Sequence, residues 1–146
     1  GYDYIWLLDA DAMIDPKSKL LHSHLRKIIN ENLSNFNIAI SENDLNGGLP
    51  LNCGSIIFKV SQFTANFIDS VIVYAKDKEP NFFMQFPWEQ EIINKEEFSK
   101  HVKALPMRTI NSWWQDTPDT PNLFVWHLMA RTNKDREELL KIYNYI

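Results

Sequence analysis

The chain has 146 residues, 45% of them hydrophobic, which is enough to bury one core of moderate size and predicts one domain over residues 1–146. Its formal net charge of -4 and the lack of a lysine or arginine cluster argue against nucleic acid or an anionic membrane surface as a partner. With Cys53 as the single cysteine no internal disulfide can form, and no apolar stretch reaches bilayer-spanning length, so any membrane anchor is expected outside this chain.

Successive segments of the chain alternate between strand and helix patterns. Residues 4–8, YIWLL, are a continuous apolar run that predicts a strand buried on both faces of a sheet. Asp15 and Pro16 then form an N-cap signal for a helix over 16–31. The remaining predictions are a strand near 36–40, a loop over 42–52, a strand over 55–60, a helix starting after Ser61, a helix over 88–98, strands at HVKAL and NLFVWHL, and a helix over 133–146. Strands that alternate with helices are typical of an α/β layer fold.

Two carboxylates follow the first apolar run, with a single alanine between them. In open α/β sheets, ligands gather outside the carboxyl ends of the strands, which is where Asp9 and Asp11 emerge. Alternation along an extended backbone predicts that both side chains point to the same side, away from Ala10. Two unpaired carboxylates repel each other and a divalent cation relieves that cost, so the pair is a candidate metal site. The alternative is that both only cap the following helix, and a bare DxD pattern also occurs by chance.

Four blocks of the sequence occur in the order found in one family of glycosyltransferases. They are DAD at 9–11, NCGSIIFKVSQFTANFID at 52–69, WEQEIIN at 88–94 and LFVWHLMARTNKDREELLKIYN at 123–144. The chain thereby resembles the galactomannan galactosyltransferases, xyloglucan xylosyltransferases and fungal α-1,6-mannosyltransferases. The resemblance implies the GT-A fold, a mixed sheet flanked by helices, and the metal-dependent, retaining transfer of a hexose or pentose from a nucleotide-sugar to a glycan or polysaccharide acceptor.

The position of the DxD block near residue 9 carries a further expectation. In enzymes of this kind the DxD closes the half of the domain that holds the nucleoside, so most of that half is expected to precede this chain. The chain would then be the C-terminal part of a catalytic domain. The family also implies a UDP-sugar or GDP-mannose as donor, and a place in the Golgi lumen as part of a type II membrane protein.

The resemblance assigns Asp9, Asp11 and His127 to a Mn²⁺ or Mg²⁺ site, in which the ion neutralises the donor diphosphate. Without the matching block, the better interpretation of His127 is a buried, hydrogen-bonded histidine at a strand end. After this histidine the family has a glycine and then a lysine that reaches the diphosphate, and this chain departs from that pattern. Arg131 and Lys134 are the nearby cations that could replace the lysine, and a simple surface charge is the alternative for Arg131.

Two further blocks are expected near the donor sugar. Asn52, Gly54 and Ser55 match an N-x-G-S block, in which glycine lets the backbone approach a ligand and the amide binds hydroxyls. An ordinary turn before a strand is the alternative. The resemblance implies that Gln90 lies beside the reacting anomeric carbon and that Glu89 binds hydroxyls of acceptor or donor. Since an amide is a poor nucleophile, Gln90 suits an ion-pair-like, front-face transfer. A solvated face of a short helix is the alternative for both.

Two other classes of protein fit parts of the sequence. A haloacid-dehalogenase-type phosphatase also has DxD after an apolar strand, with Asp9 as nucleophile. Such phosphatases have Thr or Val two residues after the second Asp, where this chain has Met13. They also have a later acidic pair, for which Asp116 and Asp119 are the candidates. A non-catalytic, glycan-binding transferase-like domain is the second alternative, and the intact set of Asp9, Asp11 and His127 argues against it.

Overall fold

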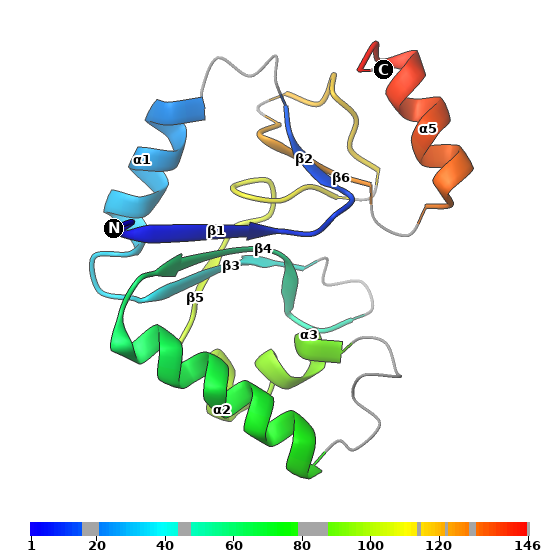
Figure 1. Cartoon of the computed structure of the whole chain (residues 1–146). Coiled ribbons are helices and arrows are strands. Elements are labelled where there is room, and N and C mark those ends of the chain that lie inside the picture. The colour runs from blue at the N-terminus through cyan, green and yellow to red at the C-terminus, as the bar shows by residue number, and fades with distance from the viewer. Residues whose placement is uncertain are drawn as a thin grey trace.

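The computed structural model describes residues 1–15, 21–43, 48–78, 88–113, 115–121, 123–128 and 131–145. Strands and helices alternate along the chain, and Figure 1 shows their arrangement. They are β1 (Tyr4–Leu8), β2 (Ala12–Ile14), α1 (Leu21–Asn32), β3 (Ile38–Glu42), β4 (Leu51–Lys59), α2 (Gln62–Lys78), α3 (Trp88–Ile93), α4 (Glu96–Ser99), β5 (Lys103–Leu105), β6 (Val125–His127) and α5 (Asn133–Ile142).

The strands form a mixed sheet and a small second ladder. The main sheet has four strands in the order β1-β4-β3-β5, in which β4 is antiparallel to β1 and β3, and β3 is parallel to β5. Strands β2 and β6 pair antiparallel as a separate two-stranded ladder. The predicted class, a mixed sheet flanked by helices, is confirmed.

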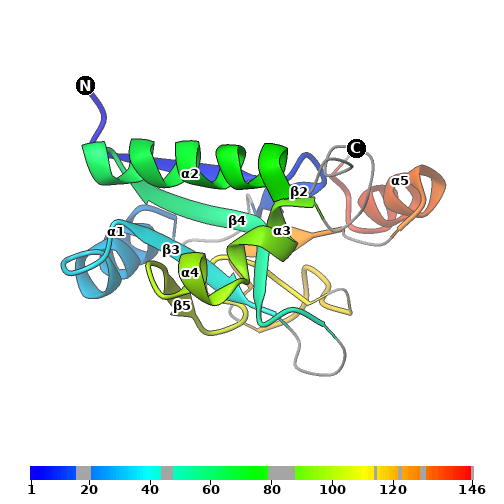
Figure 2. The ribbon, with the colours of Figure 1, turned by 90° about the horizontal axis from the view of Figure 1, so that it is seen from below.

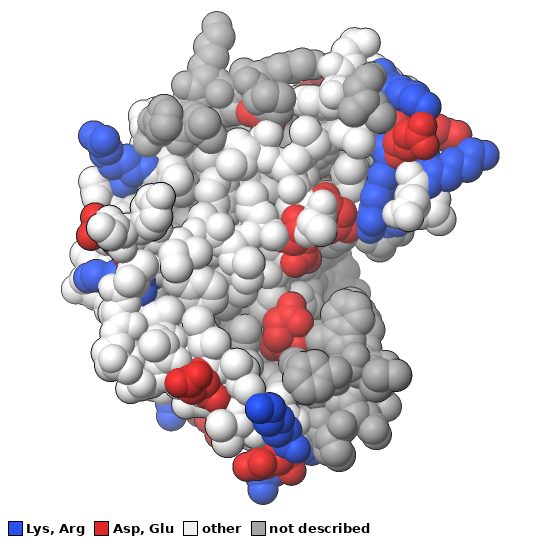
Figure 3. Space-filling model, in the orientation of Figure 1, with Lys and Arg blue, Asp and Glu red and all other residues white. Residues whose placement is uncertain are grey.

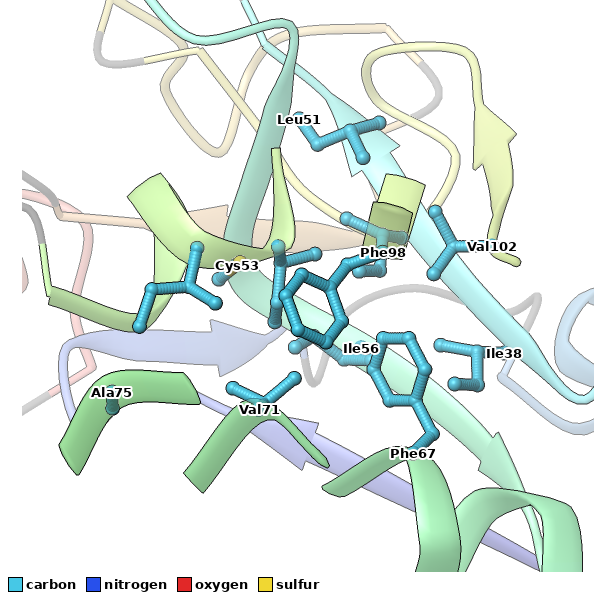
Figure 4. Close-up of a cluster of buried hydrophobic side chains, with 12 residues drawn as sticks. Ile38, Leu51, Cys53, Ile56, Phe67, Val71, Ala75, Phe98 and Val102 are labelled. Atoms are coloured by element: carbon cyan, nitrogen blue, oxygen red, sulfur yellow. The ribbon is translucent and has the colours of Figure 1, made fainter. Parts of the chain in front are cut away.

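Helices cover both faces of the main sheet, as the two views in Figure 1 and Figure 2 show. Phe67, Val71 and Ala75 recur along one face of α2 and pack on Ile56 of β4 in the core drawn in Figure 4. The opposite face of β4 buries Ile57 against α1. Side chains that alternate along a strand point to opposite faces, so one strand serves both cores.

A third apolar cluster joins the β2–β6 ladder to α5. Trp126 of β6 packs edge-on against Tyr143 at 5.6 Å between ring centroids. Helix α5 begins with a capping box, in which the Thr132 hydroxyl accepts from Asp135 N and the Asp135 carboxylate accepts from Thr132 N. Tyr145 then donates to Asp15 at 2.8 Å. These contacts hold α5 beside β2, the strand that directly follows the DxD segment.

Several predicted elements differ from the observed ones. Strand β1 is at the edge of the main sheet, and Ile5 and Leu7 are 55% and 52% exposed, so burial on both faces was wrong for the described residues. Strand β4 already begins at Leu51, inside the predicted loop, and β2 was not predicted. The helix expected over 88–98 is two short helices, because the chain turns at 94–95.

The start of the first predicted helix lies outside the described residues, which resume where α1 begins. Asp15 accepts the hydrogen bond from Tyr145, a contact that the N-cap interpretation did not foresee. Among the helices of the described ranges, none is long and apolar enough to cross a membrane.

Candidate metal and donor site

The DxD segment forms a tight turn at the end of β1. Asp9 N donates to Gly54 O at 3.0 Å, which extends the pairing with β4, and Ala12 N donates to Asp9 O at 3.0 Å, which closes the turn. The expected extended backbone was therefore wrong. The turn nevertheless leaves the carboxylates of Asp9 and Asp11 facing the same neighbour, His127.

His127 reaches this turn through the β2–β6 ladder. Ala12 is its partner in the ladder, and Leu128 N donates to Asp11 O at 2.9 Å. The imidazole is 4% exposed, and its Nε2 lies 3.1 Å from Asp11 Oδ1 and 3.5 Å from Asp9 Oδ2. One possible ligand atom from each of the three residues lies within 4.8 Å of the others. The structure thus brings together the three residues predicted as metal ligands.

The N-x-G-S block lies inside β4, beneath the imidazole of His127. A Cβ atom on Gly54 would lie 2.2 Å from His127 Cε1, so the glycine makes room for the ring of a predicted metal ligand. Asn52 Oδ1 accepts from Gly54 N at 2.9 Å. Ser55 is fully buried and its hydroxyl accepts from Trp6 Nε1 at 2.9 Å, so its side chain is not at the surface of this site.

A buried polar side chain that the sequence analysis missed holds the other side of the imidazole. Asn111 Oδ1 lies 3.0 Å from His127 Nδ1, and the neighbouring Ser112 hydroxyl accepts from His127 N at 2.7 Å. The loop that carries Asn111 and Ser112 lies between β5 and β6 and has no helix or strand periodicity. It contacts His127 only once the chain is folded, so no sequence pattern identifies either residue.

Helix α3 carries Glu89 and Gln90 next to β4. Gln90 Oε1 accepts from Cys53 N at 3.0 Å, which ties the start of the helix to the strand residue before Gly54. Partial burial raises the pKa of Glu89, and the negative charge of Asp9 adds to this rise. Burial also raises the pKa of Asp9, with Asp11 adding to the rise and His127 opposing it. The carboxylates thus repel one another in a partly buried place, and a cation bound between them would relieve that repulsion.

A cation that was not predicted contacts the DxD segment, and the two predicted ones lie nearby. Lys134 is exposed with its Nζ 3.9 Å from Glu138, and Arg131 is half-buried ahead of α5. Arg136, one turn further along α5, donates from Nη2 to Asp11 Oδ2 at 2.6 Å and from Nε to Leu128 O at 3.2 Å. Its position one turn after the N-cap Thr132 is the signal that could have identified it.

Among the hollows that the described residues line, a large one and the one that contains Asp11 are both possible places for a ligand. A larger one, of about 730 Å³, lies between α2 and α4 and is lined by Phe63, Tyr74 and His101 among others. A smaller one, of about 430 Å³, includes Asp11 and lies between β2 and α5. Figure 3 shows acidic side chains on the wall of the recess beneath α5 and basic ones at its rim. Because Asp11, one of the three possible metal ligands, lines the smaller hollow, we assign the site to it.

The acidic pair that a phosphatase would need is not at this site. Asp116 is buried, and Arg108 donates to both of its carboxylate oxygens at 2.7 to 3.1 Å. Trp113 N adds a further hydrogen bond to the same carboxylate at 2.8 Å. The side chain therefore has a structural role, which removes the best candidate for the phosphatase interpretation.

The fold has a counterpart among solved structures. The chain is similar to a glycosyltransferase involved in the glycosylation of the major capsid of PBCV-1, with a TM-score of 0.72 and 18% sequence identity. The similarity covers 96% of this chain and 66% of that chain, so this chain spans about two thirds of the length of that structure. No protein-family model and no curated protein sequence matches the chain. The chain therefore has the fold of a glycosyltransferase.

Proposed function

We propose that the chain is the C-terminal part of a catalytic domain of a metal-dependent, retaining glycosyltransferase. It would transfer a hexose or pentose from a UDP-sugar or GDP-mannose to a glycan or polysaccharide acceptor. The observation that carries the proposal is the convergence of Asp9, Asp11 and His127 on one point from segments far apart in the sequence. A glycosyltransferase fold around that point supports the same class of reaction.

The three side chains fit a divalent cation of the Mn²⁺ or Mg²⁺ type. In an octahedral shell with ligands about 2.1 Å from the ion, adjacent ligands lie about 3 Å apart. The distances of 3.1 and 3.5 Å from His127 Nε2 to the two carboxylates agree with that spacing. An imidazole beside carboxylates favours Mn²⁺ over Ca²⁺, whose ligands are usually oxygen. When bound, the ion would neutralise charge that develops on the leaving diphosphate.

Arg136 takes the role that the sequence suggested for Arg131 or Lys134. Its guanidinium already binds an anionic oxygen, that of Asp11, at the edge of the hollow. A planar guanidinium binds phosphate oxygens with two parallel hydrogen bonds, so it suits a diphosphate. We propose that Arg136 moves from Asp11 to the donor diphosphate when the metal occupies the carboxylate.

Gln90 and Glu89 are proposed to face the sugar. Since Gln90 Oε1 is held by Cys53 N, the amide nitrogen is the end that can donate to a sugar hydroxyl. Glu89 remains the carboxylate for hydroxyls of donor or acceptor. Residence in the Golgi lumen, as part of a type II membrane protein, belongs to this proposal through the sequence resemblance alone.

The test is release of UDP or GDP from a panel of nucleotide-sugars, with and without Mn²⁺ and a glycan acceptor. Asp11→Asn and His127→Ala are compared with Lys134→Gln, which changes an exposed charge outside the ligand set. The proposal predicts release that needs Mn²⁺ and is abolished by the first two variants only. Release of phosphate from phosphomonoesters, with His127→Ala active, would instead favour a phosphatase. Glycan binding without any release, by a protein that also contains the proposed nucleoside-binding half, would favour a non-catalytic domain.

A further inference from the structure

Asn111 is the central residue of a buried hydrogen-bond network behind the candidate metal ligands. The side chain is 0% exposed. Its Oδ1 lies 3.0 Å from His127 Nδ1 and accepts from Ser112 N at 2.9 Å, while its Nδ2 donates to Asn52 Oδ1 at 2.8 Å. The network links β4, the loop before β6 and the imidazole.

Backbone groups fix the orientation of both amides. The N–H of Ser112 can only donate, so the atom of Asn111 that faces it must be the oxygen. Asn52 Oδ1 accepts from the backbone N–H of Gly54, so the group of Asn111 that faces this oxygen must be the NH₂. If the oxygen and nitrogen of either amide were exchanged, a donor would face a donor or an acceptor would face an acceptor.

The orientation of Asn111 determines which nitrogen of His127 carries a proton. Nδ1 faces the amide oxygen, so it must be the donor. In a neutral imidazole the other nitrogen, Nε2, then has the lone pair. This nitrogen is the one that lies 3.1 Å from Asp11 and 3.5 Å from Asp9. In this tautomer the lone pair that a metal ion could use is therefore on the side of the carboxylates.

We propose that Asn111 is a positioning residue that keeps His127 protonated on Nδ1, so that Nε2 faces Asp9 and Asp11 as a metal ligand. The identity of the ligand as a metal ion rests on the proposed function. With Asn111 in place, a proton on Nε2 would leave the lone pairs of Nδ1 and Asn111 Oδ1 facing each other at 3.0 Å inside the protein, whereas the carboxylates of Asp9 and Asp11 are 49% and 20% exposed and are screened by solvent. Without the Asn111 oxygen this buried repulsion is gone and nothing accepts from Nδ1. The neutral ring would then place its proton on Nε2, where it blocks the metal, because the Asp11 carboxylate is the acceptor that remains.

The experiment uses ¹⁵N-labelled histidine in the metal-free chain, at a pH high enough to leave His127 neutral. The ¹⁵N chemical shifts distinguish the protonated from the unprotonated ring nitrogen. Asn111→Asp keeps an oxygen opposite Nδ1, whereas Asn111→Leu has similar size and no acceptor. His101, which is exposed, serves as the reference in the same spectra.

We expect Nδ1–H in the original chain and in Asn111→Asp, and Nε2–H in Asn111→Leu. Titration of Mn²⁺ is expected to show affinity about 10- to 100-fold lower in Asn111→Leu, as for other groups that orient metal-bound histidines, and rescue to within about tenfold in Asn111→Asp. A spectrum of the original chain with Nε2–H overturns the proposal even if Asn111→Leu fails to fold. So does unchanged Nδ1–H in a folded Asn111→Leu.

The outcome separates this inference from the proposed function. If His127 is Nδ1–H and Asn111→Leu changes the tautomer, but no nucleotide-sugar is turned over, the positioning role stands and the transferase proposal fails. If transfer is Mn²⁺-dependent but the ring is Nε2–H, the transferase proposal stands and the role of Asn111 fails.

Discussion

Gly54 and His127 are in direct contact, so that a Cβ atom on the glycine would lie 2.2 Å from Cε1 and 2.7 Å from Nδ1 of the imidazole. The backbone of His127 cannot retreat, because β2 and the Ser112 hydroxyl hold it. Gly54→Ala must therefore tilt the ring away from Asp9 and Asp11. We predict that this variant loses at least about tenfold in Mn²⁺ affinity, measured by calorimetric titration.

The matched control is Gly48→Ala, in which the new Cβ would lie 3.5 Å from Asn43 Nδ2, an ordinary contact. It should bind Mn²⁺ as the original chain does. Gly54→Ala is also expected to lose about 1 to 3 kcal/mol of stability, because the space beneath the ring is already filled. A folded Gly54→Ala chain with unchanged Mn²⁺ affinity would show that the ring position does not matter for the metal.

Under the proposed function, Arg136 and the metal ion would compete for Asp11. Its hydrogen bond to Asp11 Oδ2, at 2.6 Å, neutralises a carboxylate that the metal would need. Arg136→Met should therefore raise the affinity for Mn²⁺ alone by about fivefold, which corresponds to roughly 1 kcal/mol for a partly exposed charged hydrogen bond. The same variant should bind Mn²⁺ together with UDP or GDP more weakly than the original chain, because the cation for the diphosphate is lost.

Lys134→Met removes a positive charge from the same helix without touching Asp11, since its amine pairs with Glu138. It controls for the general loss of charge and should change neither affinity by more than about twofold, as is usual for exposed ion pairs. Opposite changes of the two affinities in Arg136→Met are the specific result. A parallel change in both, or an equal effect of Lys134→Met, would contradict the exchange of Arg136 between Asp11 and the diphosphate.

Loss of the ion pair between Arg108 and Asp116 should lower the stability of the fold without changing the affinity for Mn²⁺. Arg108 has a φ of 72°, which costs energy for a residue with a side chain, and its bidentate ion pair helps to hold that conformation. Asp116→Asn is predicted to lower stability by about 1 to 3 kcal/mol, seen as a melting temperature lower by several degrees. Mn²⁺ affinity should stay the same.

Asp119→Asn is the control, because Asp119 is exposed and was the other half of the acidic pair suggested for a phosphatase. It should leave both the melting temperature and the metal affinity unchanged. A loss of Mn²⁺ affinity in Asp116→Asn, at unchanged stability, would revive that interpretation.

Local patterns predicted most of the helices and strands, because their causes are local. Ser61 was expected to begin a helix, and its hydroxyl accepts from Thr64 N at 3.2 Å, the hydrogen bond of an N-cap. The apolar run of β1 was misjudged for a non-local reason. Burial of a strand on one face or both depends on its place in the sheet, and a short apolar run is compatible with either.

The site residues also differ in how far the sequence could predict them. The convergence of Asp9, Asp11 and His127 was expected from the order of blocks, and the structure has it. Asn111 and Arg136 were missed, since each acts through a contact with a residue far away in sequence, which no spacing rule identifies. The roles of all five residues stay predictions until metal and nucleotide binding are measured.

Acid should loosen the start of α5. Hydrogen bonds from the side chain and backbone of Thr132 hold the pKa of Asp135 below its usual range, with the charges of Arg131 and Lys134 adding to the effect. A carboxyl whose pKa is lower in the folded state stabilises the fold above its unfolded pKa of about 3.9, and this contribution is lost as the pH falls through the folded value. Protection of the first α5 amides from hydrogen exchange should therefore fall as the pH is lowered below about 4.

Glu137 titrates in the same direction, because a hydrogen bond from Lys141 lowers its pKa, so the two carboxyls must be separated. Asp135→Asn should lose protection at neutral pH and become nearly independent of acid at the first turn, whereas Glu137→Gln should keep the acid response there. Because Arg136 follows Asp135 directly, loosening of this turn should also release Asp11, which links the cap of α5 to the metal site. If the acid response of the first turn survives in Asp135→Asn but disappears in Glu137→Gln, Glu137 and not Asp135 causes it. This result would contradict the link between the cap of α5 and the metal site.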